Sequence, residues 1–181
     1  MYISEEICKS LDDKEIISRS LENMGYFRCV YLRYEKSLKR YIFKISNFSN
    51  DEADDILQNA FLNIWKNLNS YDNSMKLSSF IYRIVHNETI SRWRKTNADH
   101  SLKEAIINSH SEEEPQEEIN KSKYIQNILN KMPQKYKEIL VLKFLENMDY
   151  EEISNILKIP EGTVATRINR AKKSFVKISK I

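Results

Sequence analysis

Apolar residues recur at helical spacing along most of the chain, and the clearest run lies between residues 56 and 68. Its apolar positions fall at i, i+1, i+4, i+5, i+8, i+9 and i+12, and they are Ile56, Leu57, Ala60, Phe61, Ile64, Trp65 and Leu68. This spacing places them on one side of an α-helix, so the run predicts an amphipathic helix with one buried face. Ser49 and Glu52 precede it with the spacing of a capping box, which marks the start of the helix.

The same spacing predicts further helices on both sides of this run. They cover about 13–24, 26–45 and 79–95 in the first half of the chain, and about 124–132 and 133–144 in the second. The side chains that we expect to face the core in these helices include Ile16, Ile17, Leu21, Phe27, Val30, Tyr31, Tyr34, Leu38, Tyr41, Ile42, Ile45, Tyr124, Ile125, Ile128, Leu129, Met132, Tyr136, Ile139, Leu140 and Phe144. The residues before about Asp12 show no pattern and are expected to form a loose arm.

Signals for β-strands are nearly absent, and only two glycines and three prolines interrupt the chain. We therefore expect an all-α fold. Residues 98–120 lose the helical periodicity and contain five glutamates between positions 112 and 118, a composition typical of a flexible linker. The chain is accordingly predicted to form two small helical domains, over residues 13–97 and 121–181, joined by a flexible acidic linker.

Residues 149–173 predict a helix-turn-helix in the second domain. Asp149 and Glu152 have capping-box spacing, and Pro160 both ends the first helix and can open the second. The inner stripe of the second helix is Val164, Ile168 and Ala171, and its outward residues are Thr163, Thr166, Arg167, Asn169, Arg170, Lys172 and Lys173. Such a row of polar and basic side chains suits a helix in the major groove of DNA. An ordinary helical hairpin with a solvated basic face gives the same pattern.

The helix over about 79–95 interleaves aromatic and basic side chains, namely Phe80, Tyr82, Arg83, His86, Arg92, Trp93, Arg94 and Lys95. This mixture suits single-stranded DNA, whose bases stack on rings and whose phosphates meet cations. A helix with a core side and a basic side explains the pattern equally well. We expect His86 to contact solvent or a phosphate.

The composition argues against several classes of site. The only glycines, Gly25 and Gly162, are too few for a dinucleotide-binding loop and too far apart for a P-loop. The histidines, His86, His100 and His110, are scattered and form no metal-binding motif. Apolar runs are too short to cross a bilayer, and no signal-peptide pattern is present. We therefore expect no cofactor, no metal site, no membrane insertion and no enzymatic activity.

The cysteine and charge patterns add two expectations. Cys8 and Cys29 are the only cysteines and belong to no CxxC pair, which fits a reducing cytoplasm and argues against a disulfide scaffold. The net charge of +3 is small, but residues 167–180 hold six basic side chains and no acidic one. Blocks of one sign are typical of tails, linkers and binding faces.

The order of these segments resembles the bacterial ECF-type (extracytoplasmic-function) sigma factors over about residues 13–177. YEKSLKRYIF, EADDILQNAFLNIWKNLNSYD and FIYRIVHNETISRWRK are similar to sigma region two in its usual order. MPQKYKEILVLKFLENMDYEEISNILKIPEGTVATRINRAKKSF is similar to sigma region four, and the acidic segment stands where the family has a variable linker. The resemblance implies a non-catalytic transcription initiation factor that binds core RNA polymerase and promoter DNA.

The resemblance also implies roles for individual residues. Core polymerase would be bound by Asp54, Asp55, Gln58, Asn59 and Phe61. The minus-ten element would be bound by Phe80, Tyr82, Arg83, Asn87, Trp93, Arg94 and Lys95. The minus-thirty-five element would be bound by Thr163, Thr166, Arg167, Asn169, Arg170 and Lys173. It further implies a cytoplasmic location and an anti-sigma partner, while the alternative is a stand-alone helix-turn-helix regulator that does not act through polymerase.

Several positions depart from the family pattern. Asn59 replaces a usual glutamate, and Phe80 replaces a usual tryptophan but keeps an aromatic ring. In the helix-turn-helix, Ala165 replaces a frequent basic residue. Ser154 replaces a usual alanine and Lys158 a usual glycine, so we expect Lys158 to adopt a left-handed backbone at a cost of about 1 kcal/mol.

Overall fold

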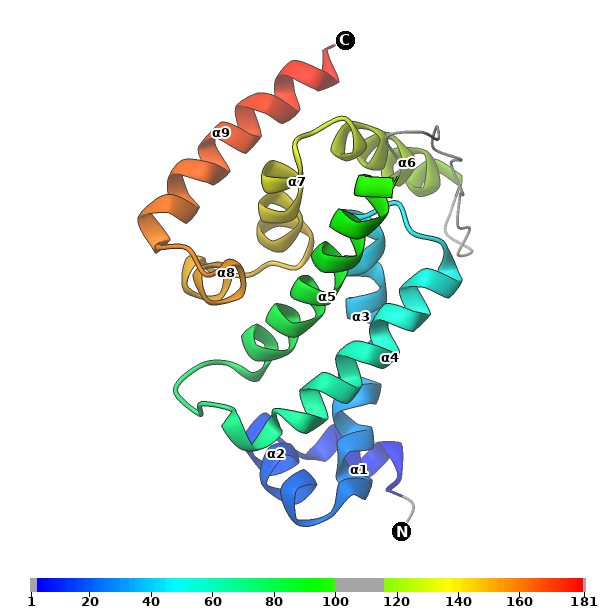
Figure 1. The fold of residues 1–181 in the computed structure, drawn as a ribbon, viewed down its shortest axis with the longest axis vertical. Coiled ribbons are helices and arrows are strands. Elements are labelled where there is room, and N and C mark those ends of the chain that lie inside the picture. Colours follow the sequence, from blue (N-terminus) through cyan, green and yellow to red (C-terminus); the bar gives the residue numbers. More distant parts are fainter. Residues whose placement is uncertain (1–2, 100–115, 181) are drawn as a thin grey trace.

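The computed structural model describes residues 3–99 and 116–180, and no strand occurs among them (Figure 1). This confirms the predicted all-α fold. The α-helices are α1 (Glu5–Ser10), α2 (Asp13–Glu22), α3 (Phe27–Ile45), α4 (Asn50–Lys66), α5 (Leu77–Asp99), α6 (Gln116–Asn130), α7 (Gln134–Leu140), α8 (Tyr150–Leu157) and α9 (Glu161–Ser179). Two 3-10 turns, η1 (Met24–Tyr26) and η2 (Leu68–Ser70), and a π-helical turn, η3 (Val141–Leu145), connect them. The predicted linker falls largely on 100–115, outside the described residues.

Helix α4 forms as its apolar stripe predicts. Ser49 accepts a hydrogen bond from the backbone of Glu52, and the Glu52 side chain accepts one from the backbone of Ser49, which completes the capping box. The stripe packs against α3 and α5, and Ala60 and Ile64 are fully buried there. Leu68 is also buried, although it lies in η2 beyond the end of the helix.

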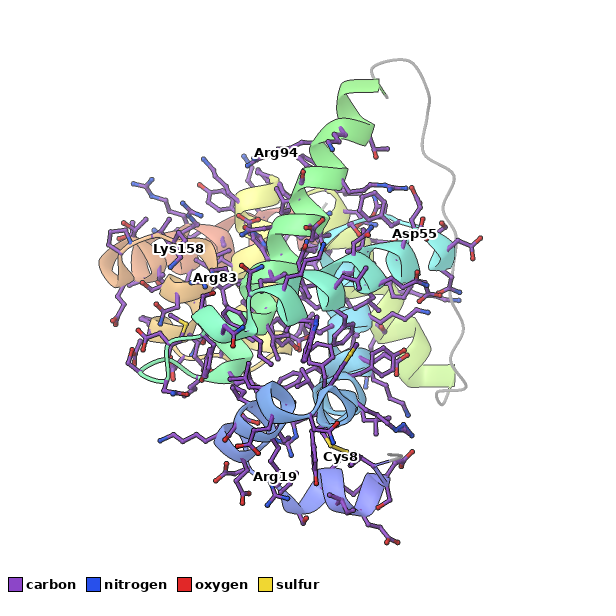
Figure 2. All side chains as sticks on the ribbon, turned by 60° about the horizontal axis from the view of Figure 1, so that its bottom comes forward. Cys8, Arg19, Asp55, Arg83, Arg94 and Lys158 are labelled. Atoms are coloured by element: carbon purple, nitrogen blue, oxygen red, sulfur yellow. A yellow bond between two sulfur atoms is a disulfide. The ribbon has the colours of Figure 1, made fainter. Side chains whose placement is uncertain are left out.

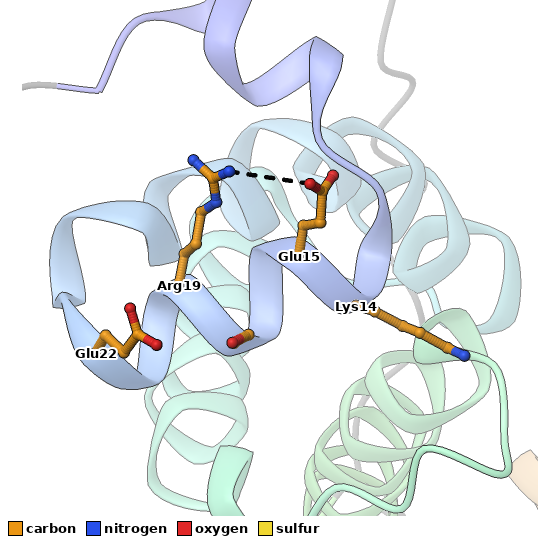
Figure 3. Close-up of a pocket in the computed structure, with 5 residues that line it drawn as sticks. Lys14, Glu15, Arg19 and Glu22 are labelled. Carbon is orange, nitrogen blue, oxygen red and sulfur yellow. Dashed lines mark ion pairs between the residues drawn. The ribbon is translucent and has the colours of Figure 1, made fainter.

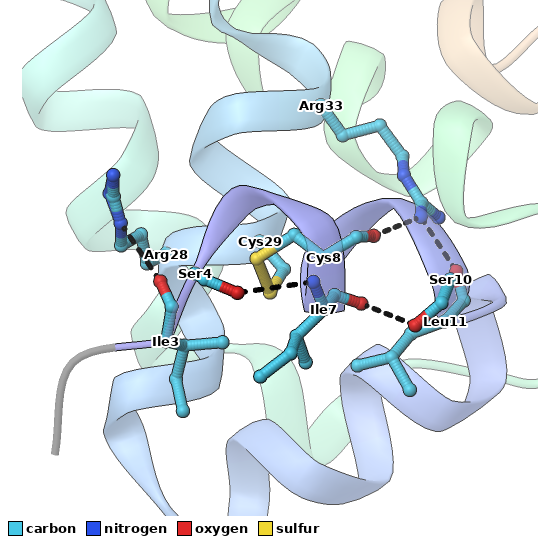
Figure 4. The surroundings of a disulfide bond; sticks show 9 residues. All are labelled: Ile3, Ser4, Ile7, Cys8, Ser10, Leu11, Arg28, Cys29 and Arg33. Carbon is cyan, nitrogen blue, oxygen red and sulfur yellow. Dashed lines mark hydrogen bonds between the residues drawn. A yellow bond between two sulfur atoms is a disulfide. The ribbon is translucent and has the colours of Figure 1, made fainter.

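The N-terminal residues correct two expectations, because they are ordered and their cysteine is oxidised. Helix α1 is capped by Ser4 and lies against α3, where Ile3 and Leu11 join the core. Cys8 of α1 forms a disulfide with Cys29 of α3 (Figure 4). The predictions were wrong because so short a helix shows too few positions for periodicity, and because docking on α3 brings together two cysteines far apart in sequence.

Four side chains that the spacing placed in the core are exposed: Leu21, Tyr31, Tyr124 and Phe144. For Phe144 the reason is η3, because a π-helical turn follows α7 and shifts the later residues around the helix axis. The two tyrosines keep their hydroxyls at the surface, where Tyr31 donates to Glu35 and Tyr124 donates to the Ser179 carbonyl.

The second domain contains the predicted helix-turn-helix. Val164, Ile168 and Ala171 are buried, as the spacing of α9 requires. The Asp149 capping box starts α8. Lys158 ends this helix with φ 54° and ψ 47°, which confirms the predicted left-handed backbone. The Ile159 N–H donates to the Ser154 carbonyl across the turn, and the Ser154 hydroxyl donates to the Ile159 carbonyl.

Lys158→Gly is expected to raise the free energy of unfolding by about 1 kcal/mol, because glycine adopts the left-handed backbone without the Cβ clash that lysine has. Urea unfolding would measure the gain. The control is Lys172→Gly, an exposed position inside α9, where glycine should cost about 1 kcal/mol. Equal losses for both variants would contradict this account of the turn.

The two domains pack against each other. Helix α5 runs through the middle of the molecule, with α3 and α4 on one side and α7 and α8 on the other (Figure 1). Contacts between α5 and α8 are extensive, and α3 touches both α6 and α7. At the end of α3, the Gln134 side chain donates to the Ile45 carbonyl at 2.9 Å. The tether between the domains is therefore supplemented by a direct interface.

Candidate functional site

The outer face of α4 is a compact exposed surface. Asp55, Gln58 and Asn59 are exposed on it, and Figure 2 shows Asp55 at the outer side of the molecule. Asp54 is half-buried because its carboxylate pairs with Lys39 Nζ at 2.6 Å. Leu62, one helical turn after Gln58, is 58% exposed and continues the same face. We call Asp55, Gln58, Asn59 and Leu62 the α4 face.

Leu62 was not among the residues predicted to bind core polymerase, although the sequence contains a sign of its exposure. It is an apolar residue on the polar side of an otherwise clean amphipathic helix. Phe61, by contrast, was predicted as a binding residue but is buried. Its ring packs against Tyr31 at 4.9 Å and Phe27 at 6.3 Å between centroids. Phe61 therefore supports the α4 face from beneath.

The aromatic residues early in α5 are covered. Phe80 is buried against the ring of Tyr71 at 5.3 Å, with the Arg83 guanidinium over it at 5.7 Å. Tyr82 is also buried, and its hydroxyl donates to Glu146 of the second domain at 2.6 Å. Burial raises the pKa of Tyr82, and the hydrogen bond to Glu146 adds to this shift. Neither ring can stack on a base in this conformation.

The later part of α5 is more open. Asn87, Arg94 and Lys95 are exposed, and Trp93 is half-buried. Figure 2 shows Arg94 on the part of α5 that extends beyond the neighbouring helices. The predicted minus-ten residues are therefore divided into a covered group near the start of α5 and an accessible group that begins at Asn87.

His86 lies in the domain interface, so the expected contact with solvent or phosphate was wrong. Its Nδ1 shares a hydrogen bond of 2.9 Å with the Tyr41 hydroxyl. Its Nε2 lies 3.6 Å from Oε2 of Glu138 on α7. Glu138 Oε1 in turn lies 4.0 Å from Nη1 of Arg167 on α9. We call Tyr41, His86, Glu138 and Arg167 the interface chain, because they run from the first domain to α9.

Burial disfavours charge on both central members of the interface chain. It lowers the pKa of His86 to about 4, with a further contribution from Arg94. It raises the pKa of Glu138 to about 7, against the opposing effect of Arg167 and Arg94. The spacing of His86 and Glu138 would suit an ion pair, but a charged imidazole is strongly disfavoured there. We therefore treat His86 as neutral at pH 7.

Acidic side chains of the second domain face basic and polar ones at the start of α5. Lys76 Nζ lies 2.9 Å from Asp149 and 3.3 Å from Glu152, and the Ser78 hydroxyl donates to Glu152 at 3.2 Å. The backbone N–H of Glu152 and then Lys76 hold the pKa of Asp149 below its ordinary value. The Lys76 pairs are exposed and contribute little stability. Their positions nevertheless show that carboxylates of the second domain lie against the start of α5, where Glu146 also contacts Tyr82.

The outer side of α9 presents the predicted row. Thr163, Thr166, Asn169, Arg170 and Lys173 are all exposed. The Thr166 hydroxyl donates to the Gly162 carbonyl at 2.9 Å, so it is partly engaged within the helix. Arg167 differs from this row, because its side chain is only 24% exposed and is directed toward Glu138.

Family models match both domains. Residues 30–98 match sigma-70 region 2, and residues 122–175 match sigma-70 region 4. The ECF RNA polymerase sigma factor SigW of Bacillus subtilis is 34% identical over 139 residues, which cover 70% of this chain and 74% of SigW. The chain belongs to the ECF family of RNA polymerase sigma factors. This sigma factor binds core RNA polymerase and directs promoter-specific transcription.

Further relatives and solved structures agree with this assignment. The sigma factor is 23% identical to the ECF sigma factor SigM of Bacillus subtilis over 147 residues, which cover 80% of this chain and 89% of SigM. It superposes on RpoE in complex with the anti-sigma factor NepR from Bartonella quintana with a TM-score of 0.71 and 21% identity, covering 86% and 97% of the two chains. CnrH in complex with the cytosolic domain of CnrY gives 0.69 and 18%, covering 92% and 96%. These structures share its fold.

Among the residues that the structure describes, the other surface features are less distinctive. A shallow hollow follows the exposed side of α2, where Arg19 pairs with Glu15 at 3.9 Å beside Lys14 and Glu22 (Figure 3). Within residues 3–99 and 116–180, no three His, Cys, Asp or Glu side chains are grouped to hold a metal ion, and no helix is long and apolar enough to cross a membrane. His100 and His110 lie outside these ranges.

Proposed function

We propose that the α4 face is the surface that binds core polymerase. The observation that carries this proposal is the exposure of three polar side chains around an exposed leucine, on a helix whose opposite side is buried. Exposed apolar residues within a polar surface often anchor protein interfaces. Phe61 and the half-buried Asp54 would position this face. In this assignment residues 13–97 form the polymerase-binding and minus-ten domain.

We further propose that α5 binds the minus-ten element. Asn87, Arg94 and Lys95 are accessible to DNA, whereas Tyr82 is held by Glu146 of the second domain and Phe80 is covered by Tyr71 and Arg83. Stacking of an unpaired base on Tyr82 would require the second domain to move away from α5. Arg83 lies beside the covered residues and Trp93 beside the accessible ones. Both would then belong to one continuous DNA-binding surface along α5.

The second domain, residues 121–181, is proposed to bind the minus-thirty-five element through α9. Its exposed row has the side chains that reach phosphates and base edges in a major groove. Ala165, which is only half-buried, contributes no hydrogen bond at a position where the family often has a basic residue. The base preference of α9 therefore rests mainly on Asn169 and Arg170.

Arg170→Ala is expected to lower transcription from a promoter that needs the minus-thirty-five element by about tenfold, because it removes an exposed contact to DNA. Arg167→Ala should have a smaller effect, since Arg167 is directed toward Glu138. Lys177→Ala, an exposed substitution later in α9, is the matched control. Transcription with purified core polymerase would measure all three. Equal losses for Arg167→Ala and Arg170→Ala would mean that Arg167 leaves Glu138 to contact DNA.

The proposed partners and location follow from the same assignment. We propose that the sigma factor acts in the cytoplasm, performs no covalent chemistry and is held inactive by an anti-sigma factor. The last point is supported by its likeness in fold to RpoE, which was solved with the anti-sigma factor NepR. An anti-sigma factor would then act by stabilising the domain interface that holds Tyr82.

Addition of the protein to purified core polymerase tests the proposed function. We expect promoter-specific transcripts, loss of core binding when the α4 face is altered, and retained core binding when Arg170 is altered. The alternative, a stand-alone helix-turn-helix regulator, would bind promoter duplex equally well without polymerase. Loss of core binding in Arg170→Ala would mean that the roles of the two domains are reversed.

A further inference from the structure

The disulfide between Cys8 and Cys29 has no part in the proposed function. It joins α1 to α3 through two cysteines that are 21 positions apart in sequence (Figure 4), and the loop that it closes contains the whole of α2 and η1. Cys29 is 0% exposed, at the first turns of α3, whereas Cys8 is 5% exposed on the short helix α1. Both cysteines are therefore buried, but Cys8 lies on the short outer helix and Cys29 on a long core helix.

Noncovalent contacts also hold the N-terminal residues in place. Arg33 Nη2 donates to the carbonyls of Cys8 at 3.0 Å and Leu11 at 2.7 Å. Arg28 Nε donates to the carbonyl of Ile3 at 3.5 Å, and the side chains of Ile3 and Leu11 are buried. These contacts do not depend on the bond between the sulfurs. The reduced protein would keep the two thiols close together, so the bond can form and break within the folded domain.

We propose that Cys8 and Cys29 form a reversible thiol–disulfide switch whose oxidant is a low-molecular-weight disulfide. The Cys8 thiolate attacks one sulfur of the oxidant, forms a mixed disulfide and releases one thiolate. The Cys29 thiolate then attacks the Cys8 sulfur, forms the intramolecular bond and releases the second thiolate. The two thiol protons of the protein end on the two released thiols. The protein loses two electrons, and the oxidant gains them.

The order of attack follows from exposure. Cys8 is on a helix of one and a half turns whose other residues are largely exposed, so a small opening of α1 gives an oxidant access to its sulfur. Cys29 is fully buried on α3 beneath α1, so we expect an oxidant to reach the Cys8 sulfur first. Cys8 is therefore the attacking cysteine, and Cys29 is the resolving cysteine.

Oxidation changes how often α1 opens. A bond that closes a loop of about 20 residues restricts the open state, which should lower its population on the order of a hundredfold. Cys29 lies between Phe27 and Tyr31, the rings that pack against Phe61 and Trp65 of α4. The switch thus sets how often α1 detaches from α3, next to the rings that pack beneath α4. The residues of the α4 face themselves stay the same.

The test uses the folded full-length protein, first treated with dithiothreitol and then with oxidised glutathione. We expect the two alkylatable thiols to disappear, the mass to fall by two hydrogens without a retained glutathione, and dithiothreitol to restore both thiols. Amide hydrogens of α1 should exchange on the order of a hundredfold more slowly in the oxidised protein. Thiols that remain alkylatable in oxidised glutathione, or equal exchange rates in both states, would overturn the proposal.

Two variants test the order of attack. Cys29→Ser should accumulate a glutathione mixed disulfide on Cys8, because the resolving thiol is absent. Cys8→Ser should accumulate little, because Cys29 is fully buried. The reverse result would overturn the assigned order. The measurements on the unmodified chain remain decisive if either variant fails to fold, and they do not depend on polymerase or DNA binding.

Discussion

Leu62→Asp is expected to weaken binding to core polymerase by about a hundredfold, the largest functional effect of a single substitution predicted for this protein. Leu62 is 58% exposed, so the leucine contributes little to folding in the free protein. In a complex it would become buried, and an aspartate there would carry a charge without a partner. Asp55 on the same face would increase the effect, because its carboxylate would repel the new one.

The measurement is a titration of the purified variant with core polymerase, followed by promoter-specific transcription. Leu21→Asp is the matched control, because Leu21 is 46% exposed on α2, in another part of the first domain. It should bind core polymerase with unchanged affinity. Normal binding by Leu62→Asp would contradict the assignment of the α4 face. Equal losses in both variants would point to a general effect on the first domain.

Long periodic runs and capping signals were sufficient to predict the elements that carry the proposed sites. Helix α4 and the helix-turn-helix both have a capping box at the start and an apolar stripe that the structure buries. The left-handed backbone of Lys158 was expected because the family that the chain resembles usually has a glycine at this position. These features depend on residues close together in sequence, which is why the sequence alone predicts them.

The features that the sequence did not predict depend on contacts between distant segments. Tyr82 and Glu146 meet across the domain interface, and Cys8 and Cys29 meet because α1 docks on α3. Both pairs require the relative placement of helices, about which periodicity carries no information. The spacing also cannot show that η3 changes the helical repeat before Phe144. The contact of Tyr82 with a second domain could not be predicted for the same reason.

The interface chain has a consequence for the dependence of stability on pH, because its two central residues are shifted in opposite directions. Glu138 has a pKa raised from 4.5 to about 7, so the folded protein disfavours its charged form. Its effect is to lower the free energy of unfolding as pH rises from about 4.5 to 7. His86 has a pKa lowered from 6.5 to about 4, so the folded protein also disfavours the imidazolium. Its effect is to lower the free energy of unfolding as pH falls from about 6.5 to 4.

These opposing effects nearly cancel between about pH 4.5 and 6.5, so single substitutions should reveal them. In His86→Gln, where only Glu138 titrates, the free energy of unfolding should fall as pH rises through this range. In Glu138→Gln, where only His86 titrates, it should rise. Each change should be on the order of 3 kcal/mol over the full titration, since each pKa is shifted by about 2.5 units.

Urea unfolding of the two variants at a series of pH values would measure both slopes. Tyr41, Arg94 and Arg167 stay unchanged in each variant, so the slopes report the two central groups within the same surroundings. Slopes of opposite sign would place both titrating groups in a buried domain interface. Two flat profiles would mean that His86 and Glu138 are solvated in solution and that the domains do not remain packed as described, which would leave Tyr82 free to reach DNA.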